Sequence, residues 1–249
     1  MSSQTAGANA LFEQNRRFYD TLWSEARLVE PQRFNTWPLV STLAAQGGRR
    51  LEVGPGLRPR LPMEGTHFVD ISAAALAVLG QRGAPVVMGE VTALPFADAS
   101  FDLVCALDIV EHVDDGDGAL SELARVAKPG AAVLISTPLH AAYWTSFDDF
   151  VGHKRRYEPP ELLAKLAQNG LSVEKSAVFG MKPRSSRLVD LGTWWLVNHR
   201  DVAMSTYNKA IMPLALRFQK ALQLAQGMVP TDGVDEVLMV CRRRAPASP

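Results

Sequence analysis

The sequence predicts an α/β fold, a doubly wound and mostly parallel seven-stranded sheet with helices on both faces. Two observations predict this class. Short apolar segments typical of strands alternate with helix-length segments over residues 49–180. Segments 104–107 and 132–135 are apolar at every position, as expected for strands that are covered on both faces. A chain of 249 residues is long enough for one domain of this size.

The expected elements follow in order along the chain. Residues 1–10 predict a disordered tail, and residues 11–46 predict a helical N-terminal cap with helices at 11–29 and 35–45. Strands are expected at 51–53, 66–69, 85–88, 101–107, 131–136, 171–179 and 237–242. Further helices are expected at 72–79, 117–127 and 159–168. The alternation breaks over 181–230, which predicts a helical insert or lid before the last strand.

Composition and charge narrow the classes of function. Lysine plus arginine and aspartate plus glutamate both number 26, so the formal net charge is zero. Because nucleic-acid enzymes usually carry a basic excess, no nucleic-acid partner is expected. Cys105 and Cys241 both lie in apolar segments, which favours reduced core thiols over disulfides or metal ligands. The absence of a secretion signal and of an apolar run of about 18 residues predicts a cytoplasmic protein.

Acidic residues and a glycine turn stand at the ends of the first four predicted strands. Residues 52–56 (EVGPG) close the first strand, and Asp70, Glu90 and Asp108 follow the next three. In doubly wound sheets ligands bind at the carboxyl ends of the strands, so these residues are expected to share one crevice. Glycines allow a close backbone approach to a ligand. Asp70 suits the two hydroxyls of a ribose, and Glu90 with the following backbone N–H suits the edge of an adenine.

These segments resemble the class I S-adenosylmethionine-dependent methyltransferases over about residues 49–180, with 237–242 as a last strand. The matching motifs are LEVGPG (51–56), HFVDIS (67–72), GEVTALPFADASFDLV (89–104), ALDIVEHV (106–113) and AAVLISTP (131–138). The ALPF, FDLV and EHV segments are similar to those of the group that methylates small molecules. The resemblance implies S-adenosylmethionine as cofactor. It also implies a cofactor site with Glu52, Gly54, Pro55 and Gly56 along the methionine, Asp70 on the ribose, Ile71, Glu90 and Val91 around the adenine, and Asp108 near the methionine end.

Two features depart from the family pattern. Arg58 stands at the third glycine position of GxGxG, and only residues 57–65 separate Gly56 from the next strand. Because this segment contains Pro59 and Pro62, the helix that normally follows the turn is expected to be absent or reduced to a turn. That loss disfavours a dinucleotide, whose pyrophosphate uses the helix end, more than S-adenosylmethionine. Arg58 or Arg60 could reach the cofactor carboxylate, and the sequence leaves this role open.

The chemistry of the family is an in-line displacement at a methyl group on positively charged sulfur. The enzyme must position the acceptor, and a hydroxyl acceptor also requires a base. His153, within GHKRRYEPPEL (152–162), and His112, within EHV, are the candidate catalytic bases. The expected function is methyl transfer to a small-molecule acceptor, at an oxygen of a partly apolar substrate, because the insert over 181–230 is rich in apolar residues.

Several alternatives stay open at this point. The acceptor atom could be nitrogen or carbon, and the chain could be a non-catalytic scaffold that keeps the cofactor fold. An NAD-dependent oxidoreductase is disfavoured because GPGLRP (54–59) lacks GxGxxG. A nucleic-acid methyltransferase is disfavoured because LDIV (107–110) stands where amino-directed members carry an NPPY-like tetrapeptide. The insert over 181–230 could also contact a membrane surface or form a homodimer face. No metal ligands are predicted.

Overall fold

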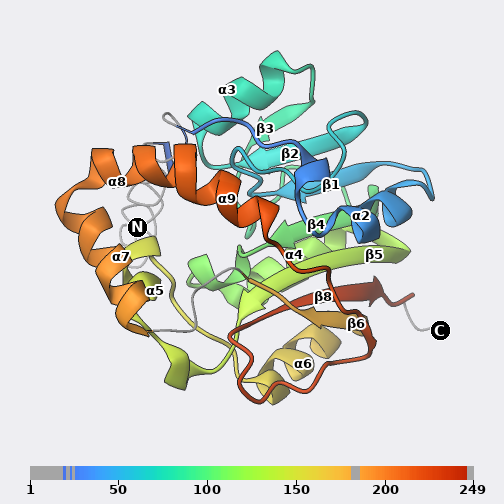
Figure 1. Cartoon of the computed structure of the whole chain (residues 1–249). Coiled ribbons are helices and arrows are strands. Elements are labelled where there is room, and N and C mark those ends of the chain that lie inside the picture. The colour runs from blue at the N-terminus through green and yellow to red at the C-terminus, as the bar shows by residue number, and fades with distance from the viewer. Residues whose placement is uncertain (1–18, 21–22, 24–25, 181–185, 246–249) are drawn as a thin grey trace, which may run out of the picture.

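The protein is described here from a computed structural model that covers residues 19, 20, 23, 26–180 and 186–245 (Figure 1). The strands are β1 (Arg50–Val53), β2 (Thr66–Asp70), β3 (Val86–Met88), β4 (Phe101–Leu107), β5 (Ala127–Pro138), β6 (Leu171–Val178), β7 (Ala225–Gln226) and β8 (Glu236–Arg243). The helices of the main body are η1 (Pro31–Arg33), α2 (Trp37–Ala44), α3 (Ala73–Gln81), η2 (Val110–His112), α4 (Gly116–Val126), η3 (Ala141–Tyr143), α5 (Ser146–Val151) and α6 (Pro159–Gln168).

The strands form one sheet in the order β3-β2-β1-β4-β5-β8-β6-β7. Strand β1 pairs in parallel with β2 on one side and with β4 on the other, so the chain winds outward in both directions from this point. A crevice for a ligand forms at the carboxyl ends of such strands. Strand β8 runs antiparallel between β5 and β6, and β7 adds a two-residue antiparallel edge. The predicted doubly wound fold is confirmed with eight strands instead of seven, because a two-residue strand has no periodic signal.

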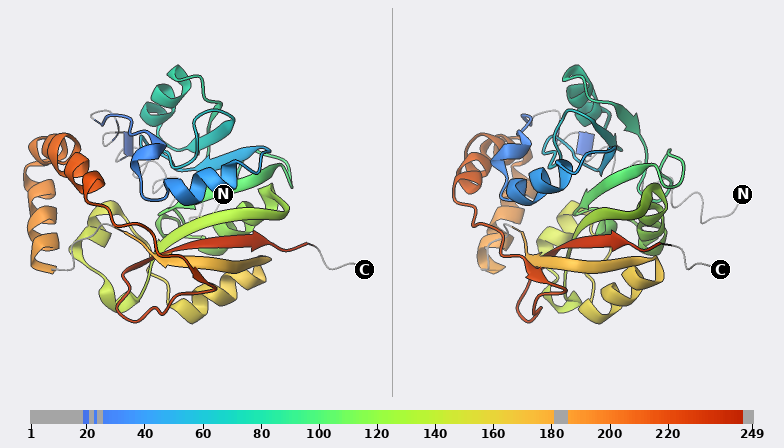
Figure 2. Two further views of the ribbon diagram at one scale, coloured as in Figure 1. Left: turned by 45° about the vertical axis from the view of Figure 1, so that its right-hand side comes forward. Right: turned by 90° about the vertical axis from the view of Figure 1, so that its right-hand side faces the viewer.

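Helices cover both faces of this sheet (Figure 2). On one face α4 and α6 pack on the strands, and Leu120 shares a core cluster with Val104. On the other face α2 packs on the strands, and Val40 shares a second cluster with Cys105. Successive residues of a strand point to opposite faces. A strand that is covered on both faces therefore needs apolar residues throughout, which is the pattern that residues 103–107 of β4 show in the sequence.

The N-terminal region agrees only in part with the predicted cap. Helix α2 lies inside the range expected for the second helix. The tail at 1–10 and most of the helix at 11–29 fall outside the described residues. The end of that helix was wrong, since residues 26–30 are not helical. The N–H of Val29 donates instead to the carbonyl of Leu57 at 2.9 Å, so a contact with the loop after β1 replaces a helical hydrogen bond.

The insert lies between β6 and β8 in the sequence. The end of β6 and the start of β8 lie at the same end of the sheet as the carboxyl ends of β1 and β4. The insert contains α7 (Ser186–Asn198), α8 (Arg200–Thr206), the π-helical turn η4 (Tyr207–Ile211) and α9 (Met212–Arg217), which form the orange arch in Figure 1. The expectation of a helical segment up to residue 230 was wrong, because residues 218–230 contain no helix and include β7. There the N–H of Val229 donates to Ser176 Oγ at 2.7 Å, which attaches this segment to the edge of the sheet.

Candidate active site

The turn after β1 requires glycine at two positions. Gly54 and Gly56 have φ angles of +67° and +52°, in the left-handed region that favours glycine. A side chain at Gly54 would collide with Ile109, and one at Gly56 would collide with the ring of Trp23. The N–H of Gly54 donates to the carbonyl of Val69 at 2.7 Å. The turn is therefore pressed closely between β2 and the segment after β4.

The carboxylate of Asp70 joins this turn to the end of β2. Its Oδ2 accepts the N–H of Gly56 and its Oδ1 accepts the N–H of Ser72, each at 2.8 Å. Burial raises the pKa of Asp70 to about 6, although these hydrogen bonds act in the opposite direction. Ser72 Oγ accepts the N–H of Ala75 and so caps α3, as the sequence predicted. Each Asp70 oxygen keeps a second lone pair that can accept a hydrogen bond from a ligand.

The shortened loop after the turn is held by a buried carboxylate and contains no helix, as expected. Glu52, which is 3% exposed, accepts the N–H groups of Arg60 and Leu61 at 2.8 Å each. Burial raises the pKa of Glu52 to about 7 against the effect of these hydrogen bonds. Leu57 and Leu61 are fully buried beneath the loop. The Glu52 carboxylate thus accepts hydrogen bonds from backbone N–H groups that a helix would otherwise pair.

The two arginines of the loop lie in different places. The guanidinium of Arg58 lies over the rings of Trp23 and Tyr207, 5.3 and 5.2 Å from their centroids, and connects the loop to the insert. The guanidinium of Arg60 lies 3.7 Å from the centroid of the Phe34 ring. Burial lowers the pKa of Arg60, while the charges of Asp108 and Glu52 counteract that effect. Arg60 is therefore the arginine beside the acids of the crevice.

Asp108 stands at the end of β4 with an unusual backbone conformation. Its φ angle of +56° lies in a region that non-glycine residues rarely adopt and that is concentrated at functional sites. Ser136 of β5 holds it there, because Ser136 Oγ accepts the Asp108 N–H at 2.9 Å and donates to Asp108 Oδ1 at 2.5 Å. The contact fixes the direction of the carboxylate at the centre of the sheet.

The residues expected around an adenine lie next to this turn in the sheet. Ile71 follows β2 directly, and Glu90 comes two residues after β3, which is the next strand outward from β2. Glu90 is half-buried, and burial raises the pKa of its carboxyl group. Val91 is 4% exposed and belongs to the core cluster that includes Val69. The carboxyl ends of β1, β2 and β3 are thus adjacent in the sheet, as the sequence predicted.

A buried ion network holds His153 just after α5. Its Nδ1 lies 2.9 Å from Oδ1 of Asp148, which is fully buried. Arg156 Nε also donates to that oxygen at 2.8 Å, and Arg156 Nη1 lies 2.9 Å from Asp235 Oδ1. Burial by itself raises the pKa of Asp148, but hydrogen bonds from His153, Arg156 and Thr145 outweigh it and hold that pKa well below its usual range. Arg156 thus pairs with two carboxylates of the protein, those of Asp148 and Asp235.

The second histidine candidate lies against the first. The rings of His112 and His153 meet edge to face with centroids 4.6 Å apart. Burial, and then the nearby charge of His153, lowers the pKa of His112 to about 3, so the ring is neutral at physiological pH. Behind both rings lies Glu111, which is fully buried and to which the sequence reading assigned no role. The structure therefore brings both predicted histidines together although 41 positions separate them in the sequence.

Tyr19 and the neighbouring Asp20 connect this histidine pair with the segment that follows β2. Its hydroxyl lies 3.3 Å from both ring nitrogens of His112. Burial, and then the charges of Glu111, Asp70 and Asp108, raises the pKa of Tyr19 well above its usual range. The neighbouring Asp20 accepts the Ser72 hydroxyl at 2.7 Å. Tyr19 and Asp20 thus connect the histidine pair with Ser72, which lies just past the end of β2.

Comparison with known proteins finds similarity over about a third of the chain. Residues 53–135 match the family model described as a methyltransferase domain. A demethylmenaquinone methyltransferase from Mycobacterium sp. strain KMS is 38% identical over 85 residues, which are 33% of this chain and 37% of that protein. One from Mycobacterium bovis strain BCG is 36% identical over 85 residues, which are 33% of this chain and 36% of that protein. The chain thus matches little more than a third of the length of these relatives.

Solved structures resemble a larger part of the chain. A possible histamine N-methyltransferase from Thermotoga maritima superposes with a TM-score of 0.55 at 18% identity, covering 84% of this chain and 93% of that one. The cyclase SpnF superposes with a TM-score of 0.54 at 18% identity, covering 84% of each chain. These likenesses show a shared fold. The family match adds that residues 53–135 are similar to a methyltransferase domain.

Proposed function

We propose that this protein transfers the methyl group of S-adenosylmethionine to a small molecule with an ionisable hydroxyl group, at that oxygen. The observation that carries the proposal is the position of His153. Its Nδ1 is bound to the buried Asp148, and its ring contacts His112 beside the crevice. An imidazole held in this way by a carboxylate is suited to accept a proton near neutral pH.

The strand ends form the cofactor part of the proposed site. Asp70 would accept the ribose hydroxyls with its remaining lone pairs. The adenine would lie among Ile71, Glu90 and Val91. The methionine portion would follow the glycine turn with Glu52, Gly54, Pro55 and Gly56, and would end near Asp108. Of the two arginines that the sequence left open, Arg60 is the proposed partner of the cofactor carboxylate, because Arg58 is occupied by Trp23 and Tyr207.

The proposed reaction needs one displacement and one proton transfer. The bond between the methyl carbon and sulfur breaks as the bond to the acceptor oxygen forms, which leaves neutral sulfur in S-adenosylhomocysteine. The hydroxyl proton passes to an imidazole. Because an ionised Asp148 accepts the Nδ1 proton of His153, Nε2 of that ring is the free base. His112 lies beside it as the second candidate, with a pKa of about 3 that makes it the weaker base.

Methyl transfer to a ring carbon of a quinone-type acceptor is the second candidate. The relatives named demethylmenaquinone methyltransferases favour it, although they match only a third of this chain. A hydroquinone carbon becomes nucleophilic when the neighbouring hydroxyl is ionised. The same histidine would therefore serve both reactions, and the acceptor atom distinguishes them.

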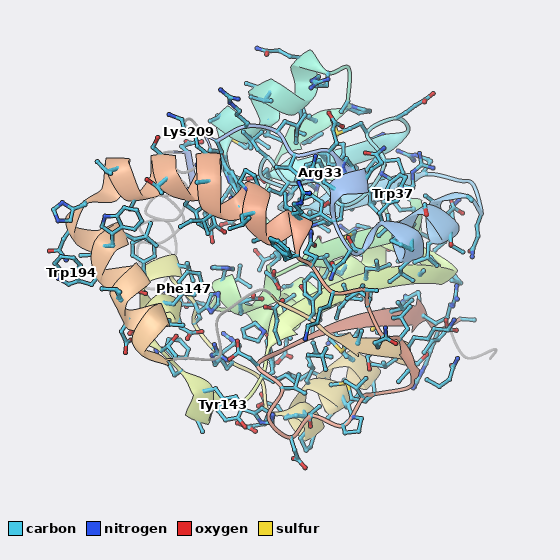
Figure 3. The ribbon with its side chains drawn as sticks, viewed as in Figure 1. Arg33, Trp37, Tyr143, Phe147, Trp194 and Lys209 are labelled. Atoms are coloured by element: carbon cyan, nitrogen blue, oxygen red, sulfur yellow. The ribbon has the colours of Figure 1, made fainter. Side chains whose placement is uncertain are left out.

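The insert is the proposed wall of the acceptor site. It is attached at two ends, by Ser146 Oγ bonding to Asp190 Oδ1 at 2.8 Å and by Asn35 N–H donating to Gln219 Oε1 at 3.0 Å. It exposes the large apolar side chains of Leu191, Trp194, Val197, Val202, Ile211, Leu214 and Phe218. Trp194 lies on its outer margin (Figure 3). Contact of this surface with a membrane or with a second copy stays a prediction. Among the described residues no helix is long and apolar enough to cross a membrane.

One experiment tests the proposal. The purified protein is incubated with S-adenosylmethionine and, separately, with a catechol, a hydroquinone and a primary amine of similar size, and S-adenosylhomocysteine is measured by mass spectrometry. We expect turnover with the hydroxylated acceptors and an O-methylated product. A C-methylated hydroquinone would favour the second candidate. Cofactor binding without turnover of any hydroxylated acceptor, or turnover of the amine alone, would contradict the proposal.

A further inference from the structure

Three potential metal ligands converge beside the proposed acceptor site. Glu111 and His112 come from η2 after β4, and His153 comes from the turn after α5. One ligand atom from each lies within 4.8 Å of the other two. This group could not be predicted from the sequence, because the spacing of 41 residues between the two histidines matches no metal-binding motif.

His153 is held through Nδ1, which leaves Nε2 for a ligand, and the Tyr19 hydroxyl lies 3.3 Å from both ring nitrogens of His112. Asp148 accepts the Nδ1 proton of His153 at 2.9 Å and is itself fixed by Arg156 and Thr145. Histidines that bind metals usually donate their second nitrogen to a carboxylate or a backbone carbonyl in this way, which sets the tautomer and the direction of the ring.

The carboxylate of Glu111 supplies an independent observation. Its side chain is fully buried, and Oε1 has no hydrogen-bond partner among the described residues. Among the described residues Oε2 accepts a hydrogen bond from the hydroxyl of Thr137 at 3.4 Å, which is long. Oε1 lies 4.0 Å from Nε2 of His153. Buried carboxylates are normally paired or coordinate metals, so an unpartnered oxygen directed at two imidazoles points to a missing cation.

We propose that Glu111, His112 and His153 bind a divalent transition-metal ion. Two imidazoles and one carboxylate suit zinc, iron, cobalt or nickel better than calcium or magnesium, which prefer oxygen ligands alone. Ligand bonds of about 2.1 Å place the donor atoms of one ion closer together than 4.8 Å, so binding draws the three side chains inward. Three protein ligands also leave coordination positions open for a small molecule.

The role of the ion rests on the proposed function, whereas its binding does not. In the loaded protein His153 is a ligand, so the ion replaces the imidazole as the group that favours an ionised acceptor oxygen. A divalent cation lowers the pKa of an oxygen that it binds. The proton of the acceptor then passes to water, and the methyl transfer is otherwise unchanged.

The test uses the full chain, freed of metal with a chelator and titrated with Co²⁺, whose visible absorption reports coordination. We expect one ion per chain and at least a tenfold loss of affinity in His153→Ala and in Glu111→Gln. His140→Ala is the matched control, because His140 contacts Glu158 and Thr231 outside the cluster. Binding of S-adenosylhomocysteine confirms that each variant is folded.

Absence of stoichiometric Co²⁺ binding in the wild type, or binding that persists in both cluster variants, would overturn the inference. An equal loss of affinity in His140→Ala would overturn it as well. The two proposals fail separately. A chain that binds Co²⁺ but methylates no hydroxylated acceptor contradicts only the proposed function. A metal-free chain that turns over but binds no Co²⁺ contradicts only the inference.

Discussion

The cofactor crevice and the insert keep their shapes by different means. In the crevice, main-chain N–H groups bind buried carboxylates, as Gly56 does with Asp70 and Leu61 with Glu52. In the insert, large apolar side chains such as Trp194 of α7 and Phe218 just after α9 are more than half exposed. Substitutions in the crevice leave buried polar groups unpaired, whereas those in the insert remove little packing. The comparison therefore predicts large effects for substitutions in the crevice and small effects for substitutions in the insert.

The largest loss of stability is expected in the buried ion network of Asp148, Arg156 and His153. Arg156→Leu leaves Asp148 buried with fewer partners, which costs about 3–5 kcal/mol for a buried pair. The free energy of unfolding, measured by urea denaturation, checks this. The exposed pair of Arg82 and Glu30 is the control, and Arg82→Leu is expected to cost less than about 1 kcal/mol. Equal losses in the two variants would show that burial does not set the difference.

Loss of the proposed base should separate catalysis from cofactor binding. His153→Ala is expected to lower kcat by about 100-fold, because general base catalysis contributes that order of rate. The Kd of S-adenosylmethionine should stay unchanged, since the residue lies on the acceptor side. Steady-state kinetics and calorimetry check the two quantities, with His140→Ala as control. Normal turnover in the folded variant would remove His153 from the mechanism.

A smaller effect is expected for the proposed ribose ligand. Asp70→Ala should weaken cofactor binding at least tenfold, or by about 1.4 kcal/mol, through lost hydrogen bonds. Titration calorimetry with S-adenosylhomocysteine measures the change. Asp98→Ala removes a mostly exposed carboxylate elsewhere and should leave the Kd unaltered. An unchanged Kd in folded Asp70→Ala would contradict the assignment.

The pH dependence of binding sharpens the same assignment. Because the pKa of Asp70 is raised to about 6, affinity for S-adenosylhomocysteine should rise by up to about tenfold between pH 5 and 7 as the carboxyl ionises. Its contribution to folding has the opposite sign. A raised pKa stabilises the folded state below about pH 4 and loses this effect as the pH passes 6. Asp70→Asn should remove the contribution of Asp70 to both pH dependences. The contribution of Glu52, whose pKa is about 7, should remain. An identical profile in Asp70→Asn would assign the titration to another group.

The smallest effect is expected in the insert. Phe218→Ser changes a side chain that is 73% exposed, so stability should change by less than about 0.5 kcal/mol. The Kd of the cofactor should also stay the same. Urea denaturation and calorimetry check both values. A loss of more than about 2 kcal/mol would show that the exposed apolar surface is packed against something in solution, such as a second copy.

Much of the arrangement at the ends of β1 and β2 could be predicted, because the sequence features that indicate it are local. A glycine turn, an acid at the end of a strand and a capping serine each occupy a few successive residues, as in the segments around Gly54 and Asp70. The shortened loop was also readable from its prolines. The role of Glu52 in that loop was not, since its partners Arg60 and Leu61 are reached only when the chain folds back.

The sequence by itself determined the doubly wound fold and the order of the strand ends, because periodicity and turn chemistry are properties of neighbouring residues. Only the tertiary structure decided which side chains meet across the crevice. It placed Arg60 rather than Arg58 beside Asp108, and it joined Glu111 and His112 to His153. Contacts between distant segments depend on how helices pack on the sheet, and no local pattern records that geometry.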